Sequence, residues 1–207
     1  MYDDEFELTF DLSDADEASR APEPEQEPVQ EAAPEPAAET EPAAETEPPV
    51  EPVPELAVPA ANGRCVLISG GDRGIGAAAA RAFWQAGYRV AVLYHTHAEA
   101  AAALEKALPG LLAVQCDVAS RASCEVAFHT VEQAVGHVDV LVSNAGIAQQ
   151  KLFTDITPEE WQHMLDVNLS GAFHLCQLAL PGMIRRKAGR ILTVSSMWGQ
   201  TGGSCEV

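Results

Sequence analysis

Apolar residues follow two different patterns before and after residue 62. From Arg64 onward, short apolar runs alternate with longer segments in which apolar residues recur at helical spacing. The short runs predict strands at 65–69, 89–94, 111–116, 138–143 and 190–195. The longer segments predict helices at 75–86, 97–107, 120–136 and 158–185, which end at Gly87, Gly110, Gly136 and Gly189.

The order of these elements indicates the fold class. Strands and helices alternate through residues 62–207, and runs such as 138–142 are almost continuously apolar, which is typical of parallel strands covered on both faces. Right-handed crossovers between such strands give an α/β fold. We therefore predict a doubly wound parallel sheet, a Rossmann fold, in a domain of residues 62–207.

Residues 1–61 have a different composition. Eleven of the 14 prolines lie there, and the segment 35–40 (EPAAET) is repeated at 41–46. Residues 1–62 contain 19 Asp and Glu and a single Arg, whereas the remaining residues contain 12 acidic and 11 basic side chains. The composition predicts a disordered acidic extension, because it offers too little apolar surface to offset the entropy of ordering. Alternating Phe and Leu at 6–12 could add a strand to a partner's sheet, or they are incidental in a solvated tail.

Charge and cysteine content exclude several classes. The nearly neutral domain has no stripe of Lys and Arg, so nucleic acid is not an expected partner. The sequence shows no apolar run of membrane-spanning length and no basic signal peptide, which predicts a cytoplasmic protein without a membrane partner. The five cysteines are scattered without C-x-x-C spacing, so we expect neither a metal site nor a disulfide framework.

Candidate chemistry begins with the glycine-rich segment 65–76. An apolar strand leads into Gly70, Gly71, Gly74 and Gly76, and an alanine-rich helix follows at once. Backbone N–H groups at a helix start bind anions, and glycines let a phosphate group approach closely. The spacing S-G-x3-G-x-G differs from the dinucleotide fingerprint G-x-G-x-x-G. By itself the segment could also be a tight connection between a strand and a helix.

Five segments in order along the chain resemble motifs of the short-chain dehydrogenase/reductase family. The loop from Ser69 to Gly76 is similar to the family's T-G-x-x-x-G-x-G, with Ser in place of Thr. The other four segments are Asp117-Val118, Val142-Ser143-Asn144-Ala145-Gly146, Asp166-Val167-Asn168-Leu169 and Val194-Ser195-Ser196. Within the family, the pattern most resembles the 3-oxoacyl-carrier-protein reductase branch.

The resemblance implies a role for each matched residue. The expected cofactor-binding residues are Ser69, Gly70, Arg73, Gly74, Ile75, Gly76, Asp117, Val118, Asn144, Ala145 and Gly146. Ser196 would hydrogen-bond the substrate oxygen and Asn168 would support a water relay, so these are the expected catalytic residues. The implied reaction is hydride transfer between a nicotinamide and a small-molecule carbonyl or acyl-thioester substrate, and full-length members form homo-oligomers.

The positions of these residues are consistent with a ligand site, although simpler explanations exist. Gly70, Asp117, Asn144 and Ser196 all follow predicted strands, and ligands bind at the carboxyl ends of strands in open α/β sheets. Taken alone, Asp117 could cap the helix near Ser120, Asn144 could be a turn residue, and Ser196 could be an ordinary serine at a strand end.

The choice between the two nicotinamide cofactors depends on charge near the adenosine ribose. An acidic residue at the end of the second strand would bind the ribose 2′-hydroxyl of NAD, but residues 93–96 (LYHT) contain none. Arg73 in the glycine loop offers a cation for a 2′-phosphate. We therefore expect NADP as the cofactor.

Part of the family's catalytic apparatus is not present in this sequence. The family's tyrosine follows its serine by thirteen positions, which from Ser196 falls beyond Val207, and its lysine comes later still. We therefore expect a sheet that is incomplete at its C-terminal side and an inactive fragment of a reductase. The alternative is a non-catalytic nucleotide-binding or assembly module with an acidic interaction tail. A serine hydrolase is disfavoured, because Ser196 lacks the G-x-S-x-G context.

Overall fold

The computed structural model describes residues 60–197 and 199. The predicted disordered extension, residues 1–61, lies outside these residues except for its last two positions. At the start of the described chain, Asn62 donates its backbone N–H to the Gly87 carbonyl over 2.9 Å and its side-chain amide to the Ala86 carbonyl. The first described residues therefore pack against the turn that follows the first helix.

The described residues form a five-stranded parallel sheet. Its strands run in the order β3-β2-β1-β4-β5. Their bounds are β1 (Cys65–Ser69), β2 (Arg89–Tyr94), β3 (Leu112–Gln115), β4 (Val140–Ser143) and β5 (Arg190–Thr193). This order confirms the doubly wound α/β prediction, and it reverses direction between β1 and β4, where such sheets bind ligands.

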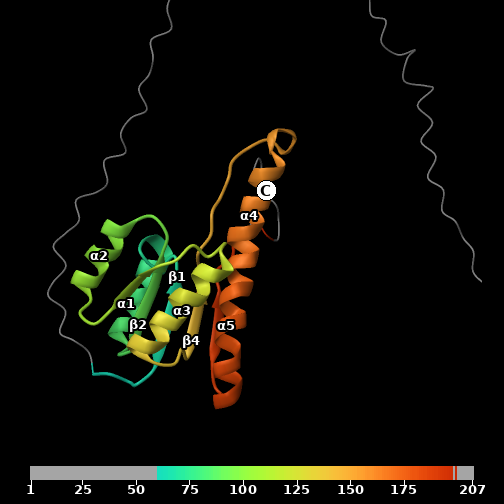
Figure 1. Ribbon diagram of the computed structural model, residues 1–207. Coiled ribbons are helices and arrows are strands. Elements are labelled where there is room, and N and C mark those ends of the chain that lie inside the picture. Colours follow the sequence, from blue (N-terminus) through green and yellow to red (C-terminus); the bar gives the residue numbers. More distant parts are fainter. Residues whose placement is uncertain (1–59, 198, 200–207) are drawn as a thin grey trace, which may run out of the picture. The chain divides into compact units, whose positions relative to one another are not determined.

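Helices cover both faces of the sheet, giving three layers (Figure 1). Alternate residues of β1 point to opposite faces, as the pleat requires. On one face, Val66 and Ile68 pack with α1 (Gly74–Gln85) and α2 (Ala98–Ala107). On the other, Cys65 and Leu67 pack with α3 (Arg121–Val135) and α5 (Gly171–Arg186).

The helix predicted at 158–185 is present, but a π-helical turn divides it into two α-helical parts. A short 3₁₀ turn, η1 (Phe153–Asp155), comes first. It is followed by α4 (Pro158–Leu165), by a π-helical turn, η2 (Asp166–Ser170), and by α5. Together α4, η2 and α5 form a long column beside the sheet (Figure 1). The π-helical turn ends at a close contact with the loop after β3. A Cβ atom at Gly171, the first residue of α5, would lie only 2.9 Å from Val118 Cγ2.

The end of α5 also differs from the prediction. Lys187, and not Gly189, adopts the left-handed conformation at the helix end, with φ of 52°. Gly189 is required for a different reason, since a Cβ atom there would collide with the Met183 side chain. Strands β3, β4 and β5 are also one or two residues shorter at an end than predicted.

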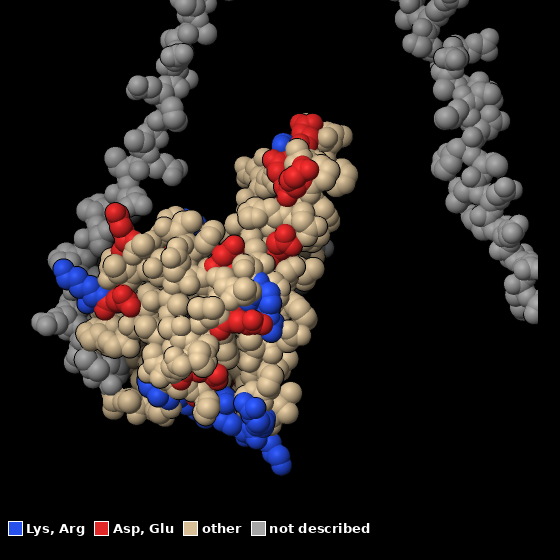
Figure 2. Space-filling model, viewed as in Figure 1, with Lys and Arg blue, Asp and Glu red and all other residues tan. Residues whose placement is uncertain are grey.

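Basic side chains gather at the end of the domain where α5 ends (Figure 2). Arg185 and Arg186 lie in the last turn of α5, where cations stabilise the helix dipole. Arg186 also donates to the Val138 carbonyl over 2.8 Å and lies 3.7 Å from Asp139. This basic cluster lies at the amino ends of the strands. Within the described residues, no helix is long and apolar enough to cross a membrane.

Candidate functional site

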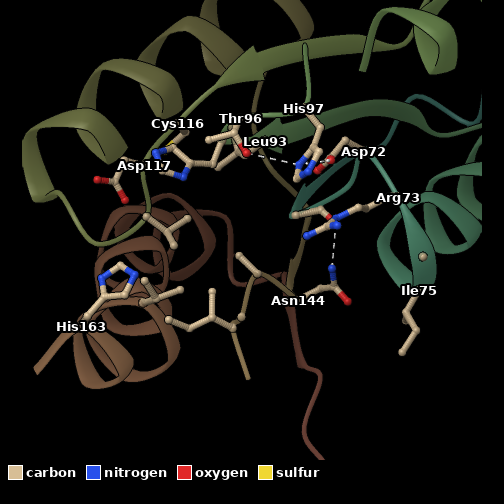
Figure 3. Close-up of a pocket in the computed structure, with 18 residues that line it drawn as sticks. Asp72, Arg73, Ile75, Leu93, Thr96, His97, Cys116, Asp117, Asn144 and His163 are labelled. Carbon is tan, nitrogen blue, oxygen red and sulfur yellow. Dashed lines mark hydrogen bonds and ion pairs between the residues drawn. The ribbon is translucent and has the colours of Figure 1, made fainter. Parts of the chain in front are cut away.

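A cleft of about 550 Å³ opens at the carboxyl ends of the strands, beside the point where the strand order reverses (Figure 3). Its walls come from the loops after β1, β2, β3 and β4, and from α4 and η2. The lining residues are Gly70, Asp72, Arg73, Gly74, Ile75, Leu93, His95, Thr96, His97, Cys116, Asp117, Val118, Asn144, Ala145, Gly146, Ile147, His163 and Val167.

The glycine loop between β1 and α1 is closely packed against the neighbouring loop. Gly70 has a φ of 60°, and a Cβ atom at Gly76 would collide with the Gly70 carbonyl oxygen and lie 2.7 Å from Asn144 Nδ2. Gly74 also has a positive φ, of 54°, but a Cβ atom there would meet no protein atom within 4 Å. Gly76 is therefore needed for protein packing, whereas Gly74 leaves open space beside the cleft.

The amino end of α1 differs from those of two other helices. Ser120 caps α3 through its side chain, and Thr157 caps α4 in a capping box with Glu160. At α1 the preceding residue, Arg73, makes no side-chain capping bond, and the first turn contains no acidic residue. The N–H groups of this first turn therefore keep the positive end of the helix dipole at the cleft, where the geometry suits an anion.

Ser69 and Asn144 join the loops after β1 and β4. The buried Ser69 hydroxyl accepts hydrogen bonds from the backbone N–H groups of Asn144 and Ala145, each over 3.0 Å. In return, the Asn144 amide donates to the carbonyls of Ser69 (3.0 Å) and Gly70 (2.9 Å). Asn144 thus both lines the cleft and fixes the start of the glycine loop.

Asn168 lies in η2 and holds the loop after β4. Its Oδ1 accepts the backbone N–H of Ile147 over 2.8 Å, and its Nδ2 donates to the Ile147 carbonyl over 3.0 Å. A π-helical turn within a helix is often found at a functional site. Here it lies beside the cleft, which Ile147 and Val167 both line.

The loop after β3 supplies Asp117 and Val118 to another wall of the cleft. Asp117 Oδ1 accepts the backbone N–H of Ala119 over 3.0 Å, so the carboxylate shapes its own turn, while Ser120 caps α3. The neighbouring Cys116 also lines the cleft, and its Sγ lies 3.9 Å from Sγ of Cys124. The hydrogen bond between the two thiols lowers the pKa of Cys116 and raises the pKa of Cys124.

Asp72 was not among the residues predicted from the sequence. Its side chain is only 6% exposed, and its Oδ2 has no hydrogen-bond partner among the described residues. Nδ1 of His97 lies 3.6 Å from this oxygen, an ion-pair contact, and the two side chains face each other across one wall of the cleft (Figure 3). Thr96 Oγ1 lies 3.3 Å from the same nitrogen.

Comparison with known proteins shows the family. The sequence profile described as short chain dehydrogenase matches residues 64–207, which include every described strand and helix. The chain belongs to the short-chain dehydrogenase family. The Rossmann fold and the order of the motifs are those expected from the sequence resemblance.

Several curated proteins and a solved structure are similar to this chain. Acetoacetyl-CoA reductase of Shinella zoogloeoides is 40% identical over 139 residues, which cover 67% of this chain and 57% of that protein. The 3-oxoacyl-[acyl-carrier-protein] reductase MabA of Mycobacterium avium is 40% identical over 144 residues, or 68% of this chain and 53% of that protein. The crystal structure of gox2181 aligns with a TM-score of 0.62 at 32% identity, covering 66% and 55% of the two chains. The chain therefore spans a little over half the length of these relatives.

Most of the residues predicted from the motifs lie together in the structure. Nine of them line the cleft: Gly70, Arg73, Gly74, Ile75, Asp117, Val118, Asn144, Ala145 and Gly146. Ser69, Gly76 and Asn168 are not lining residues but hold the loops that line it. Ser196 follows β5 and is exposed, and it is not among the lining residues.

Several of the other lining residues occupy sequence positions that indicate a site. His95, Thr96 and His97 follow β2 directly, so the strand-end argument applied to them as well. Asp72 lies inside the glycine motif, and as the motif's one acidic residue it was visible in the sequence. His163 carried no signal, because α4 reaches the cleft only through tertiary structure.

Proposed function

We propose that the cleft binds NADP(H) for hydride transfer between the nicotinamide and the carbonyl or alcohol carbon of a 3-oxoacyl thioester, a reaction for which residues 1–207 supply the cofactor site but not the family's tyrosine and lysine. The observation that carries the proposal is the uncapped amino end of α1, which faces a cleft beside a glycine loop with open space at Gly74. The geometry fits a pyrophosphate, because an anion would satisfy the free N–H groups of the first helical turn. When bound, the cofactor supplies the hydride.

Each group of lining residues has a proposed part in binding. The backbone of Gly74, Ile75 and Gly76 would hold the pyrophosphate, and the exposed guanidinium of Arg73 would bind the 2′-phosphate. Asp117 and Val118 would contact the adenine. The segment 144–146, with Ser69 beneath it, would line the remaining part of the cofactor site.

The two residues expected to be catalytic have different proposed roles. Both side-chain polar atoms of Asn168 are engaged with Ile147, so we assign it as a positioning residue that fixes the loop beside the cleft. Ser196 follows β5, the strand next to β4, and would hydrogen-bond the substrate oxygen. The substrate class rests on the relatives, whose names specify acetoacetyl-CoA and 3-oxoacyl-carrier-protein substrates. We further expect a homo-oligomer.

Substitution Gly74→Asp tests the anion site. A side chain at this position meets no protein atom within 4 Å, so the only cost to folding is the strain of the positive φ, while its carboxylate opposes the pyrophosphate. We expect NADPH binding to be lost in a fluorescence titration. Gly110→Asp is the matched control, because Gly110 also has a positive φ and open space but does not line the cleft. Equal NADPH affinity in the two variants would contradict the proposed site.

Substitution Arg73→Ala tests the choice of cofactor. Losing a charged contact with a phosphate should weaken NADPH binding about tenfold or more, and NADH binding much less. Arg64→Ala is the control, since Arg64 is exposed at the amino end of β1, away from the cleft. Equal losses for both nucleotides, measured by calorimetric titration, would remove the support for NADP.

A further inference from the structure

The carbonyl oxygen of Val118, a residue of the cleft wall, is held by two helices. It accepts a hydrogen bond from Nδ1 of His174 in α5 over 3.1 Å and another from the thiol of Cys124 in α3 over 3.5 Å. Because a carbonyl oxygen can only accept, Nδ1 of His174 carries the proton in this contact. A side chain of α5 thus reaches the backbone of a residue that lines the cleft.

The same part of α5 also packs against Val118 and the start of α3. A Cβ atom at Gly171 would lie 2.9 Å from Val118 Cγ2, so the Val118 side chain fits closely against the α5 backbone. Arg121, the first residue of α3, donates to the Gln177 side chain over 2.6 Å and to the His174 carbonyl over 3.4 Å. The helices α3 and α5 lie side by side on one face of the sheet (Figure 1). The loop after β3 is therefore fixed against α5 by packing and by hydrogen bonds.

The bond from His174 also bears on the Asp117 carboxylate through a single peptide unit. The Val118 carbonyl and the Ala119 N–H belong to the same planar peptide group, so one cannot rotate without the other. His174 holds the carbonyl end of this group, and Asp117 Oδ1 accepts the N–H at its other end over 3.0 Å. The orientation that His174 gives to the peptide group is therefore the one that keeps the Asp117 carboxylate in its turn.

We propose that His174 is a positioning residue for cofactor binding, whose Nδ1–H group orients the peptide between Val118 and Ala119 and so sets the cleft wall formed by Asp117 and Val118. This inference rests on the proposed nicotinamide function, in which those two wall residues contact the adenine. Among the residues that the structure describes, none of α5 lines the cleft, so His174 acts on the cofactor only through the loop. Its effect is confined to the adenosine half of the cofactor.

Losing the donor would free the peptide group to turn. The Val118 carbonyl would keep its bond to the Cys124 thiol, but a thiol is a weak donor. A carbonyl that turns toward water to regain a full hydrogen bond would carry the Ala119 N–H away from Asp117 Oδ1. Both wall residues would then lose their present positions, although the packing of α5 against the sheet could remain.

The test measures how each half of NADP binds to the 207-residue chain and its variants. His174→Leu keeps most of the side-chain volume but removes the donor, so 2′,5′-ADP, the adenosine half, should bind about fivefold more weakly, the effect of one hydrogen bond. NADPH should weaken by a similar factor. Binding of nicotinamide mononucleotide, the other half, should stay within about twofold, because separate sites respond nearly independently. His174→Asn places an amide donor near the position of Nδ1 and should restore 2′,5′-ADP binding.

Calorimetric titration distinguishes positioning from a purely structural role. It separates the affinity from the number of folded sites, so a residue that serves stability alone would lower the unfolding temperature and leave the dissociation constants unchanged. His174→Ala removes the same donor without the bulk of Leu and should weaken 2′,5′-ADP at least as far. Poor folding of either variant therefore leaves the other to decide the result.

His129→Leu provides the matched control. His129 is an exposed histidine of α3 whose Nε2 lies 2.7 Å from Nε2 of Gln133, and it does not line the cleft. Its replacement should leave all the dissociation constants within about twofold. Unchanged 2′,5′-ADP binding in His174→Leu and His174→Ala, an equal loss for both halves, or no recovery in His174→Asn overturns the role of His174 alone. Binding of neither NADPH nor 2′,5′-ADP by the unsubstituted chain overturns the proposed function itself.

Discussion

The β1 and β5 sides of the sheet differ in how completely they are buried. All five residues of β1 are buried, whereas in β5 only Ile191 is partly covered and the other three residues are exposed. The helices follow the same division. α3 buries five residues and α4 buries none, while α5 buries four on its sheet-facing side and leaves Phe173 and Ile184 58% and 69% exposed on the other.

The difference in burial indicates which side of the sheet supports nucleotide binding. The loops after β1, β2, β3 and β4, which line the cleft, are supported by strands and helices whose apolar faces are already buried. The side formed by α4, α5 and β5 presents apolar side chains to solvent instead, a surface suited to contact with further protein. Nucleotide binding should therefore depend little on β5 and on the exposed face of α5, whereas α4 and η2 contribute His163 and Val167 to the cleft wall.

The largest expected effect compares two leucines in adjacent strands. Leu141 in β4 is fully buried, and Leu192 in β5 is 48% exposed. Leu141→Ala should lower the free energy of unfolding by about 3 kcal/mol, because it leaves a cavity in the core. Leu192→Ala should lower it by less than about 1 kcal/mol. Urea unfolding followed by circular dichroism measures both, and equal losses would show that β5 is as well packed as β4.

Two glycine substitutions should change stability in opposite directions. Gly76→Ala forces a Cβ atom against the Gly70 backbone, so we expect a loss of about 1–3 kcal/mol. Gly182→Ala on α5 meets only Nη1 of Arg186, at 3.1 Å, so a small shift of that side chain admits the Cβ atom and helix propensity should add about 0.5–1 kcal/mol. Thermal unfolding distinguishes them. A stabilised Gly76→Ala variant would mean that the glycine loop has more room than the structure shows.

The smallest expected effect concerns the reactivity of two thiols. Burial raises the pKa of Cys65 in β1 to about 11, and it also raises that of Cys176 in α5, which is less buried. Because the thiolate is the reactive form, alkylation of Cys65 should stay slow at pH 8 and keep accelerating until the pH passes its pKa. Peptide mass spectrometry after iodoacetamide treatment should find Cys176 modified first. Equal rates would indicate that the β1 side opens readily.

Much of the fold could be predicted because it depends on local patterns. Each of the five strands is an apolar run, and the parallel order follows from their alternation with helices. The ends of the strands were harder to predict. Val138 is buried but precedes the first paired residue of β4, so hydrophobicity alone placed the strand's start too early.

What could not be predicted depends on contacts between distant residues. The π-helical turn coincides with hydrogen bonds between Asn168 and Ile147, 21 positions earlier in the chain. The glycine motif identified Gly70, Gly74 and the start of α1 as part of the site. It did not show that the Asp72 side chain is buried at the cleft opposite His97, because side-chain direction in a loop is set by its neighbours.

The π-helical turn also accommodates one residue more than a regular helical turn would. Its hydrogen bonds span five residues where those of an α-helix span four, so deleting one residue within 166–170 would leave a regular α-helix with α4 and α5 close to their present phase. His163 could then stay in the wall of the cleft and α5 could stay packed against the sheet, but the wide turn that presents Asn168 to Ile147 would be gone. One extra residue thus gives the helix a local contact with the loop after β4 at little cost to the packing on either side.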